Sequence, residues 1–328
     1  MTNKTAVAVA HPNIAFIKYW GNRDDQLRLP ANGSISMNLE NLYTQTRVEF
    51  LPELEVDCLT INYQATTGVP LLRVSEFLDI FRKMGKVESR AKVTSINNFP
   101  IGSGIASSAA AFAALALAAS SALHLNLDEA ALSRLARRGS GSASRSIPSG
   151  FVEWLPGEDD PTSFSVSIAP PDYWNLVDCI AIVEAGPKKV GSTEGHALAS
   201  TSPLQTARLN DTPRRLDLCR RAIQARDFEA LAMIVEMDSN LMHAIMMTSV
   251  PPLFYWSPTS LELMKAIPRM RKSGLPVCYT LDAGPNVHVI CHADVAGLVE
   301  SHLIHFDGVS SVLTSPVGGP AILVNANE

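Results

Sequence analysis

The segment spanning residues 97–120, NNFPIGSGIASSAAAFAALALAAS, constrains the fold most, because a glycine- and serine-rich elbow leads directly into an alanine-rich run. Alanine is the best helix former, so the run predicts a helix from about Ala106 to Leu123. Gly102 and Gly104 allow a tight turn in front of it. A helix N-terminus presents free N–H groups and partial positive charge, which favours a bound phosphate. The alternative is a turn whose serines only cap the helix.

The spacing of the elbow excludes two common phosphate-binding loops. A P-loop requires a lysine after its last glycine, and no lysine follows Gly104. The dinucleotide fingerprint GxGxxG has Ser107 in place of its third glycine. Its acidic residue, expected ~20 residues later, would be Asp128, which opens a helix instead of closing a strand. A dehydrogenase is therefore disfavoured.

Length, charge and cysteine usage narrow the class of protein. A chain of 328 residues suits two domains, and a net charge of -5 provides no basic field for nucleic acid or an anionic membrane. Five dispersed cysteines without a CxxC pair favour free thiols in a reducing compartment. The longest apolar run, Ala109–Ala119, is shorter than the ~20 residues of a membrane span, and the first residues do not resemble a signal peptide. We therefore expect a cytoplasmic protein.

Strands and helices alternate along both halves of the chain, which predicts the α+β class. Helices are expected at Leu71–Met84, within LDEAALSRLARRGS, from about Thr212 to Met247, and at SLELMKAIPRMRKSG. Strands are expected at TAVAVA, SISMNL, TQTRVEFL, KVTSINNF, FSVSIAP, LVDCIAIVEA, VCYTLDAG and AILVN. The Pro-Pro-Asp segment at residues 170–172 predicts a boundary between domains 1–172 and 173–328.

Several motifs resemble those of known families. PIGSGIASSAA resembles the phosphate loop of the GHMP kinase superfamily. HPNIAFIKYWGNRD, RRGSGSASRSIPSGFVEW and DAGPN resemble segments of the mevalonate diphosphate decarboxylases, and the similarity spans nearly the whole chain. The resemblance implies the two-domain GHMP kinase fold: an N-terminal ATP-binding domain like ribosomal protein S5 domain 2, a ferredoxin-like C-terminal domain, and a cleft between them. It also implies a homodimer.

The resemblance implies an ATP-dependent decarboxylase that uses Mg2+ and belongs to the mevalonate route to isoprenoids. In this chemistry ATP phosphorylates the tertiary 3-hydroxyl of a phosphorylated mevalonate. Phosphate then leaves, and CO2 departs from the neighbouring carbon to give a terminal alkene. Phosphoryl transfer of this kind depends mainly on positioning and charge stabilisation.

Four residues are expected to carry the reaction by this resemblance. Asp282 would act as the general base on the 3-hydroxyl, although an aspartate there could only organise a turn. Arg145 would bind the substrate carboxylate, since guanidinium binds it bidentately and keeps its charge; a surface ion pair is the other interpretation. Asn13 would orient that carboxylate and Arg145, and Lys18 would meet the 5-phosphate end of the substrate.

The remaining expected site residues contact the two substrates. The substrate pocket would be lined by Tyr19, Asn22, Arg73, Ser140, Ser142, Ser192 and His196. The ATP phosphates would be wrapped by Pro100, Gly102, Ser103, Gly104, Ala106, Ser107 and Ser108. No protein ligand is assigned to Mg2+, which is expected to bind through phosphates and water.

Two positions bear on the length of the substrate's phosphate chain. Asn22 stands where diphosphate-specific enzymes have the second lysine of KYWGKRD, and His196 stands where they usually have methionine. Fewer cations suit a substrate of lower charge, so we expect (R)-5-phosphomevalonate as substrate and isopentenyl phosphate as product. The alternatives are a diphosphomevalonate decarboxylase that makes isopentenyl diphosphate, and a GHMP small-molecule kinase that stops after phosphorylation.

Overall fold

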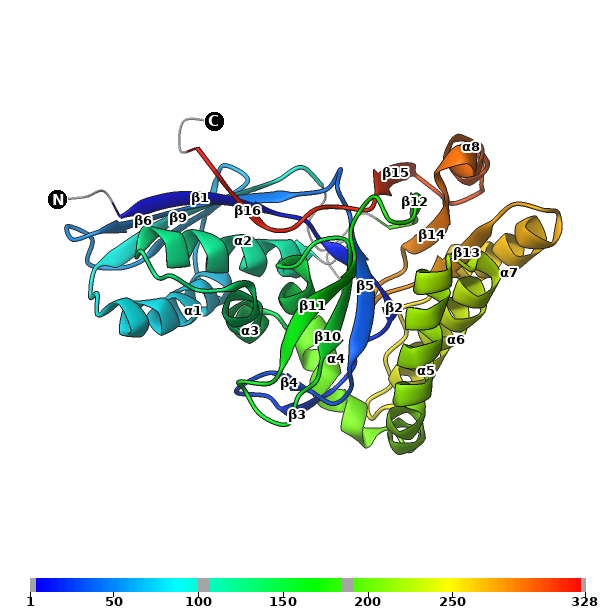
Figure 1. Ribbon diagram of the computed structural model, residues 1–328, viewed down its shortest axis with the longest axis horizontal. Coiled ribbons are helices and arrows are strands. Elements are labelled where there is room, and N and C mark those ends of the chain that lie inside the picture. Colours follow the sequence, from blue (N-terminus) through cyan, green and yellow to red (C-terminus); the bar gives the residue numbers. More distant parts are fainter. Residues whose placement is uncertain (1–3, 100–106, 185–190, 326–328) are drawn as a thin grey trace.

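The computed structural model describes residues 4–99, 107–184 and 191–325. Within these residues the chain forms a six-stranded sheet, two four-stranded sheets, a small two-stranded sheet and eight α-helices (Figure 1). Helices and strands are mixed in both halves, and the expected α+β class is confirmed. No helix among the described residues has both the length and the apolar character required to cross a membrane.

The six-stranded sheet joins the beginning of the chain to its end. Val7 on β1 lies opposite Arg47 on β6 and opposite Val324 on β16, so β1 is antiparallel to both neighbours. The expected division into domains at residue 172 stays a prediction, and β16 lies with the first half. The strand order is β16 (Ile322–Val324), β1 (Thr5–Ala10), β6 (Thr44–Leu51), β9 (Arg90–Asn97), β7 (Cys58–Ile61) and β8 (Gln64–Thr66).

Three helices cover one face of this sheet (Figure 1). They are α1 (Val69–Gly85), α2 (Ser107–Ala122) and α3 (Glu129–Gly139). Helix α2 packs on β1, β6, α3 and the 3-10 helix η1 (Gly141–Ser146), and its side chains are buried on nearly all sides. Alanine fits this place because its small side chain lets neighbouring elements approach closely. The expected helix from 106 to 123 is observed, apart from residue 106, which lies outside the described residues.

The second sheet packs against two long helices. Its apolar side chains share one core with α5 (Gln205–Ala225) and α6 (Phe228–Thr248). The β3–β4 hairpin follows directly after β2 along the chain. The sheet order is β11 (Phe164–Ala169), β10 (Phe151–Leu155), β5 (Ser34–Asn38) and β2 (Asn13–Ile17), and the hairpin is β3 (Asn22–Asp24) and β4 (Leu29–Pro30).

The third sheet belongs to the second half of the chain and places the DAGPN segment. All of its strand pairs are antiparallel, and α7 (Pro258–Lys272) and α8 (Ala296–Ile304) share its apolar core. DAGPN connects β13 with β14, and the short helix α4 (Ser192–Leu198) precedes α5. The strand order is β13 (Val277–Thr280), β14 (Val287–His292), β12 (Leu176–Ile182) and β15 (Ser311–Pro316).

The helical region expected from about Thr212 to Met247 contains two helices, α5 and α6, with a break that was not predicted. Arg226 adopts a φ of 53° and ends α5 in the left-handed conformation. Asp227 then caps α6, since its Oδ1 accepts from the Ala230 N–H at 3.0 Å. The break lets α5 and α6 pack side by side.

Candidate active site

An ion pair connects the two halves of the chain. Lys18 follows β2, Asp282 follows β13, and Lys18 Nζ lies 2.6 Å from Asp282 Oδ1. The Lys18 side chain is 1% exposed and that of Asp282 is 25% exposed, so only the carboxylate opens toward solvent. Burial lowers the pKa of Lys18, and the negative charge of Asp282 opposes that effect. The pair thus presents the Asp282 carboxylate to solvent, while the Lys18 ammonium behind it is buried.

Arg145 lies in η1 and is held from three directions. Its Nη1 donates to Ser34 Oγ at 2.6 Å, its Nε donates to Ser36 Oγ at 3.0 Å, and its Nη2 donates to Asn13 Oδ1 at 3.0 Å. Asn13 is fixed in turn, because its Nδ2 donates to Ser146 Oγ at 2.8 Å. These bonds set the plane of the guanidinium group.

The guanidinium of Arg145 retains capacity for a ligand. It has five N–H donors, and the bonds above engage one on each nitrogen. One N–H on each terminal nitrogen therefore has no partner among the described residues, which suits a bidentate carboxylate. Burial lowers the pKa of Arg145 to about 10, so the group remains charged at neutral pH. The charge of Asp282 acts on both Arg145 and Lys18, which places the three groups in one electrostatic cluster.

Three aromatic side chains, Tyr19, Trp154 and His196, lie next to this cluster, and we call them the aromatic wall. Tyr19 stacks on His196 at 4.2 Å between ring centroids and meets Trp154 edge-on at 4.8 Å, and its hydroxyl donates to Asn22 Oδ1. Burial raises the pKa of Tyr19, so the phenol stays neutral. His196 Nδ1 accepts from the Gly21 N–H at 2.9 Å, and burial lowers the pKa of His196 to about 3. Neither Asn22 nor His196 therefore contributes positive charge.

A glycine at the start of η1 allows this wall to form. A Cβ at Gly141 would lie 2.5 Å from Tyr19 Cε1. The ring is wedged between Trp154 and His196 and has no room to withdraw. We expect Gly141→Ala to raise KM for the phosphorylated substrate about tenfold and to destabilise the fold by ~1–3 kcal/mol. Steady-state kinetics and thermal unfolding measure both effects, and a wild-type KM would contradict the packing role.

The start of α2 reaches the same region. Ser108 Oγ lies 3.1 Å from Ser140 Oγ, and the carbonyl of Ser142 accepts from Asn13 Nδ2 at 3.1 Å. The first turn of α2, with Ser107 and Ser108, thus adjoins the segment that carries Arg145. The other expected ATP contacts, Pro100, Gly102, Ser103, Gly104 and Ala106, lie outside the described residues. Ser192 begins α4, and its side chain is likewise not described.

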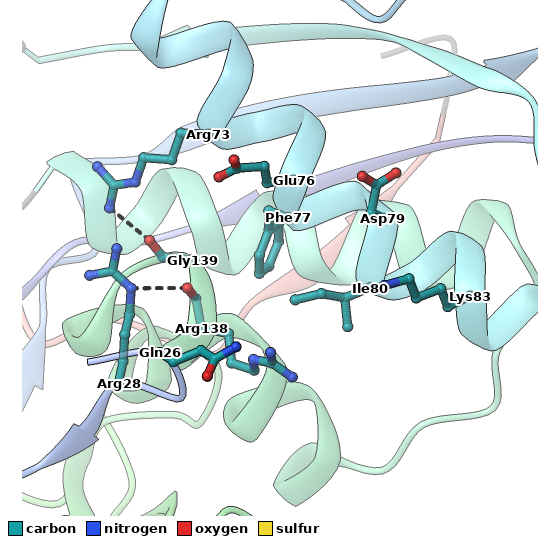
Figure 2. A pocket seen from close by; sticks show the side chains of 10 residues that line it. All are labelled: Gln26, Arg28, Arg73, Glu76, Phe77, Asp79, Ile80, Lys83, Arg138 and Gly139. Atoms are coloured by element: carbon teal, nitrogen blue, oxygen red, sulfur yellow. Dashed lines mark hydrogen bonds between the residues drawn. The ribbon is translucent and has the colours of Figure 1, made fainter. Parts of the chain in front are cut away.

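A cationic pocket of about 550 Å³ opens beside the end of α3 (Figure 2). Arg73 Nη2 donates to the Gly139 carbonyl at 2.7 Å, and Arg28 Nε donates to the Arg138 carbonyl at 3.0 Å. Figure 2 shows the two guanidinium groups close together on one side of the pocket, with Lys83 on the other side. Burial and, to a smaller extent, the charge of Arg28 lower the pKa of Arg73 to about 10. Gly139, which lines the pocket, directly precedes Ser140 in the chain.

The structure brings most of the expected site residues together, and it adds others. Asp282, Lys18, Arg145 and Asn13 form the charged cluster, with Tyr19, Asn22 and His196 beside it; their catalytic and binding roles stay predictions. Residues that sequence reasoning missed are Ser34 and Ser36, which orient Arg145, and Arg28. The two serines are two apart on β5 and so share a face, which was a readable signal. Arg28 lies in LRLPANGSISMNL, the segment that follows HPNIAFIKYWGNRD and resembles the same family, but no role was assigned to it from the sequence.

Two family models match nearly the whole chain. Residues 10–165 match the diphosphomevalonate decarboxylase-like N-terminal domain, and residues 179–319 match the mevalonate 5-diphosphate decarboxylase C-terminal domain. A relative from Saccharomyces cerevisiae, named diphosphomevalonate decarboxylase, is 38% identical over 87% of this chain and 77% of its own length.

Solved structures agree with these matches. Mevalonate diphosphate decarboxylase from Staphylococcus aureus superposes with a TM-score of 0.94 at 36% identity, covering 99% of each chain. A structure described as MDDEF in complex with MVAPP, AMPPCP and magnesium gives a TM-score of 0.93 at 37% identity, covering 98% of this chain and 99% of that one. The expected two-domain α+β fold of GHMP kinase type is confirmed by this likeness.

Proposed function

Because the chain belongs to the mevalonate diphosphate decarboxylase family, we propose that it converts mevalonate 5-diphosphate and ATP into isopentenyl diphosphate, CO2, ADP and phosphate. The observation that carries this proposal is the shared cluster of Asp282, Lys18 and Arg145. A carboxylate that faces solvent and a guanidinium with two open N–H groups suit the two ends of a 3-hydroxy acid. Homologues of this chain are ATP-dependent decarboxylases, which confirms the expected enzyme class.

The expected preference for the 5-monophosphate is wrong. The curated relatives are named diphosphomevalonate decarboxylases, and the solved relative described above holds MVAPP. The expectation depended on the missing lysine at Asn22 and assumed that no other cation takes its place. Arg28 supplies positive charge near the same wall, since its charge acts on Tyr19 and His196, and Arg73 lines a pocket together with Arg28.

Asp282 acts on the 3-hydroxyl in this proposal. The carboxylate accepts a hydrogen bond from the hydroxyl, aligns its oxygen for attack, and takes the proton as the bond to phosphorus forms. Lys18 was expected at the 5-phosphate end of the substrate, but its side chain is 1% exposed and its Nζ lies 2.6 Å from Asp282 Oδ1. In this proposal Lys18 instead keeps the carboxylate in one rotamer and balances its charge in a partly closed site.

Arg145 acts on the carboxylate end of the substrate. Loss of phosphate from the tertiary carbon leaves positive charge there, and the neighbouring carboxylate releases electrons into it as CO2. The fixed guanidinium keeps that carboxylate in the geometry where the breaking bond aligns with the electron-poor carbon. Asn13, Ser34 and Ser36 hold the guanidinium so that it cannot move toward that carbon.

The nucleotide fits the start of α2. The first turn of α2 carries Ser107 and Ser108 and offers free N–H groups to the phosphates of ATP. The solved relative holds AMPPCP and magnesium, in agreement with the expected ATP and Mg2+. Mg2+ usually binds through phosphate oxygens and water in phosphoryl transfer, so it would bind the phosphates of the nucleotide here. Bound there, Mg2+ would neutralise phosphate charge.

A change at Arg28 tests how the diphosphate is bound. A charge-assisted contact is worth ~1.5–3 kcal/mol, so Arg28→Gln is expected to lower kcat/KM for mevalonate 5-diphosphate roughly 10- to 100-fold, mainly through KM. The KM for ATP should stay within about twofold. Lys83→Gln, which removes a charge from the other side of the same pocket, serves as the matched control and should leave kcat/KM unchanged. Equal effects of Arg28→Gln and Lys83→Gln on kcat/KM would contradict a specific contact between Arg28 and the diphosphate.

The proposed function is tested by a side-by-side assay of mevalonate, its 5-phosphate and its 5-diphosphate. ADP and CO2 are both followed. We expect the highest kcat/KM with the diphosphate and one CO2 for each ADP. ADP without CO2 would indicate a kinase, and a higher kcat/KM with the 5-phosphate would overturn the substrate assignment.

Three further expectations accompany this proposal. The enzyme is expected to be a cytoplasmic homodimer, to bind neither nucleic acid nor membranes, and to divide into domains at residue 172. Gel filtration with light scattering measures the oligomeric state, and limited proteolysis near residues 170–172 tests the domain boundary.

A further inference from the structure

We propose that Asp238, Arg208 and Arg215, three buried charged residues on α5 and α6, are positioning residues for Lys18. The inference rests on the proposed catalytic role of Lys18. Asp238 Oδ2 accepts from the Lys18 backbone N–H at 2.6 Å. Arg208 Nη2 donates to the Lys18 carbonyl at 2.7 Å. The backbone N–H and C=O of one residue are thus held by side chains that lie 220 and 190 residues further along the chain.

Two further residues, Arg215 and Asn32, brace this arrangement. Arg215 Nη2 donates to the Arg208 carbonyl at 2.8 Å, and its Nε lies 3.3 Å from Asp238 Oδ1. Asn32 Nδ2 also donates to the Lys18 carbonyl at 2.9 Å, and Asn32 Oδ1 accepts from Arg208 Nη1. We call Asp238, Arg208, Arg215 and Asn32 the Lys18 clamp.

Burial of the charged clamp residues costs free energy, so stability alone does not explain why they are there. Asp238 and Arg215 are 0% exposed and Arg208 is 3% exposed. Charges this deeply buried lose their hydration, and an apolar set of similar volume often stabilises a fold equally well or better. The position of the clamp gives a better reason for its buried charges, because the clamp holds Lys18 and Lys18 in turn contacts Asp282. Misplacement of a catalytic group by ~1 Å can lower a rate about 100-fold.

The clamp also affects the charge of Lys18. The charged or titratable groups that interact with this ammonium are Asp282 after β13, Asp238 on α6, Arg145 in η1 and His243 on α6, while Arg208 on α5 binds the Lys18 backbone carbonyl. Burial lowers the pKa of His243 to about 3, so this ring is neutral near pH 7. Asp282 and Asp238 raise the pKa of Lys18, whereas Arg145 lowers it. Removal of the Asp238 charge should therefore make Lys18 lose its proton at a lower pH.

The test compares Asp238→Asn with a matched change on the same helix. The asparagine oxygen can still accept from the Lys18 N–H, whereas the negative charge and the contact with Arg215 Nε are lost. We expect kcat to fall about 100-fold, KM for both substrates to change less than threefold, and the alkaline limb of the kcat profile to move down by about one pH unit. Glu236→Gln is the control, because Glu236 on α6 pairs with Arg271 at 2.7 Å and accepts from the Tyr279 N–H. It should lower the unfolding temperature but leave kcat and the pH profile unchanged.

A second pair of variants guards against misfolding of the first. Arg208→Gln should lower kcat with little change in KM, and Arg208→Lys should restore part of the loss, because a lysine can still donate to the Lys18 carbonyl. A purely structural role would move the unfolding temperature alone, and that result would overturn the proposal. Equal losses in Asp238→Asn and Glu236→Gln would also overturn it.

One readout does not require activity. The Lys18 side chain can be titrated by NMR through its 13C-labelled Cε, with Lys18→Arg used to assign the signal. A lower titration midpoint in Asp238→Asn supports the clamp even if the enzyme releases no CO2, in which case only the proposed function fails. An unchanged midpoint in a folded Asp238→Asn overturns the clamp.

Discussion

Replacement of Asp282 by asparagine is expected to lower kcat about 10²- to 10⁴-fold, the range of general-base contributions. The amide matches the carboxylate in shape but cannot take the hydroxyl proton. It also leaves the Lys18 ammonium, 1% exposed, without its 2.6 Å ion-pair partner. ATP binding should change little, because the nucleotide is proposed to bind at the start of α2. Coupled ADP release measures kcat, and a fluorescent ATP analogue measures nucleotide affinity.

The control for Asp282→Asn is Asp294→Asn. Asp294 is an exposed carboxylate in the turn that follows β14, and its replacement should leave both ADP and CO2 formation unchanged. Near-full activity of Asp282→Asn would remove the general-base assignment. A parallel loss of ATP affinity would point instead to a structural role for the Lys18–Asp282 pair.

Replacement of Arg145 by glutamine is expected to lower kcat/KM about 10²- to 10³-fold, comparable with the loss of one preorganised donor at a reacting group. Glutamine cannot offer two charged N–H groups to a carboxylate. The change also removes the donor that Ser34, Ser36 and Asn13 now share, which should destabilise the fold by ~1–3 kcal/mol. Kinetics with the 5-diphosphate and thermal unfolding measure the two effects.

The two effects of Arg145→Gln can be separated. Arg220→Gln breaks the two-bond ion pair with Glu153 between α5 and β10, and should lower stability without a loss of kcat/KM. Added guanidinium ion should restore part of the activity of Arg145→Ala by entering the vacated site. A kcat/KM for Arg145→Gln that equals the wild-type value would contradict carboxylate binding by this residue.

The parts of the fold that depend on local residue patterns could be predicted from the sequence. The alanine-rich helix at 107–122 was predicted nearly to the residue, because composition and a glycine elbow both mark it. The break between α5 and α6 was missed, although Asp227 is a common helix cap and stands at the right place. A cap of this kind competes with a continuous helical pattern, and the pattern alone does not show which one prevails.

At the site, the contacts between residues that lie far apart in the chain could not be predicted from the sequence. Motifs located Lys18, Arg145 and Asp282, but not the contacts that orient them, since Ser34 and Asp238 meet their partners only in the folded chain. The substrate was misjudged for the same reason. One missing cation at Asn22 was counted, while the positive charge of Arg28, which acts on Tyr19 and His196, was not.

The pairing of β16 with β1 affects the order in which the protein can be completed during synthesis. β1 is synthesised before the other described elements, whereas its partner at Ile322–Val324 follows only after all of them. Until then Val7 and Val9 lie on an open strand edge that can pair with another nascent chain. Early chaperone binding at this edge would therefore favour correct folding, and a fragment ending near residue 172 should aggregate unless a peptide with the β16 sequence is added.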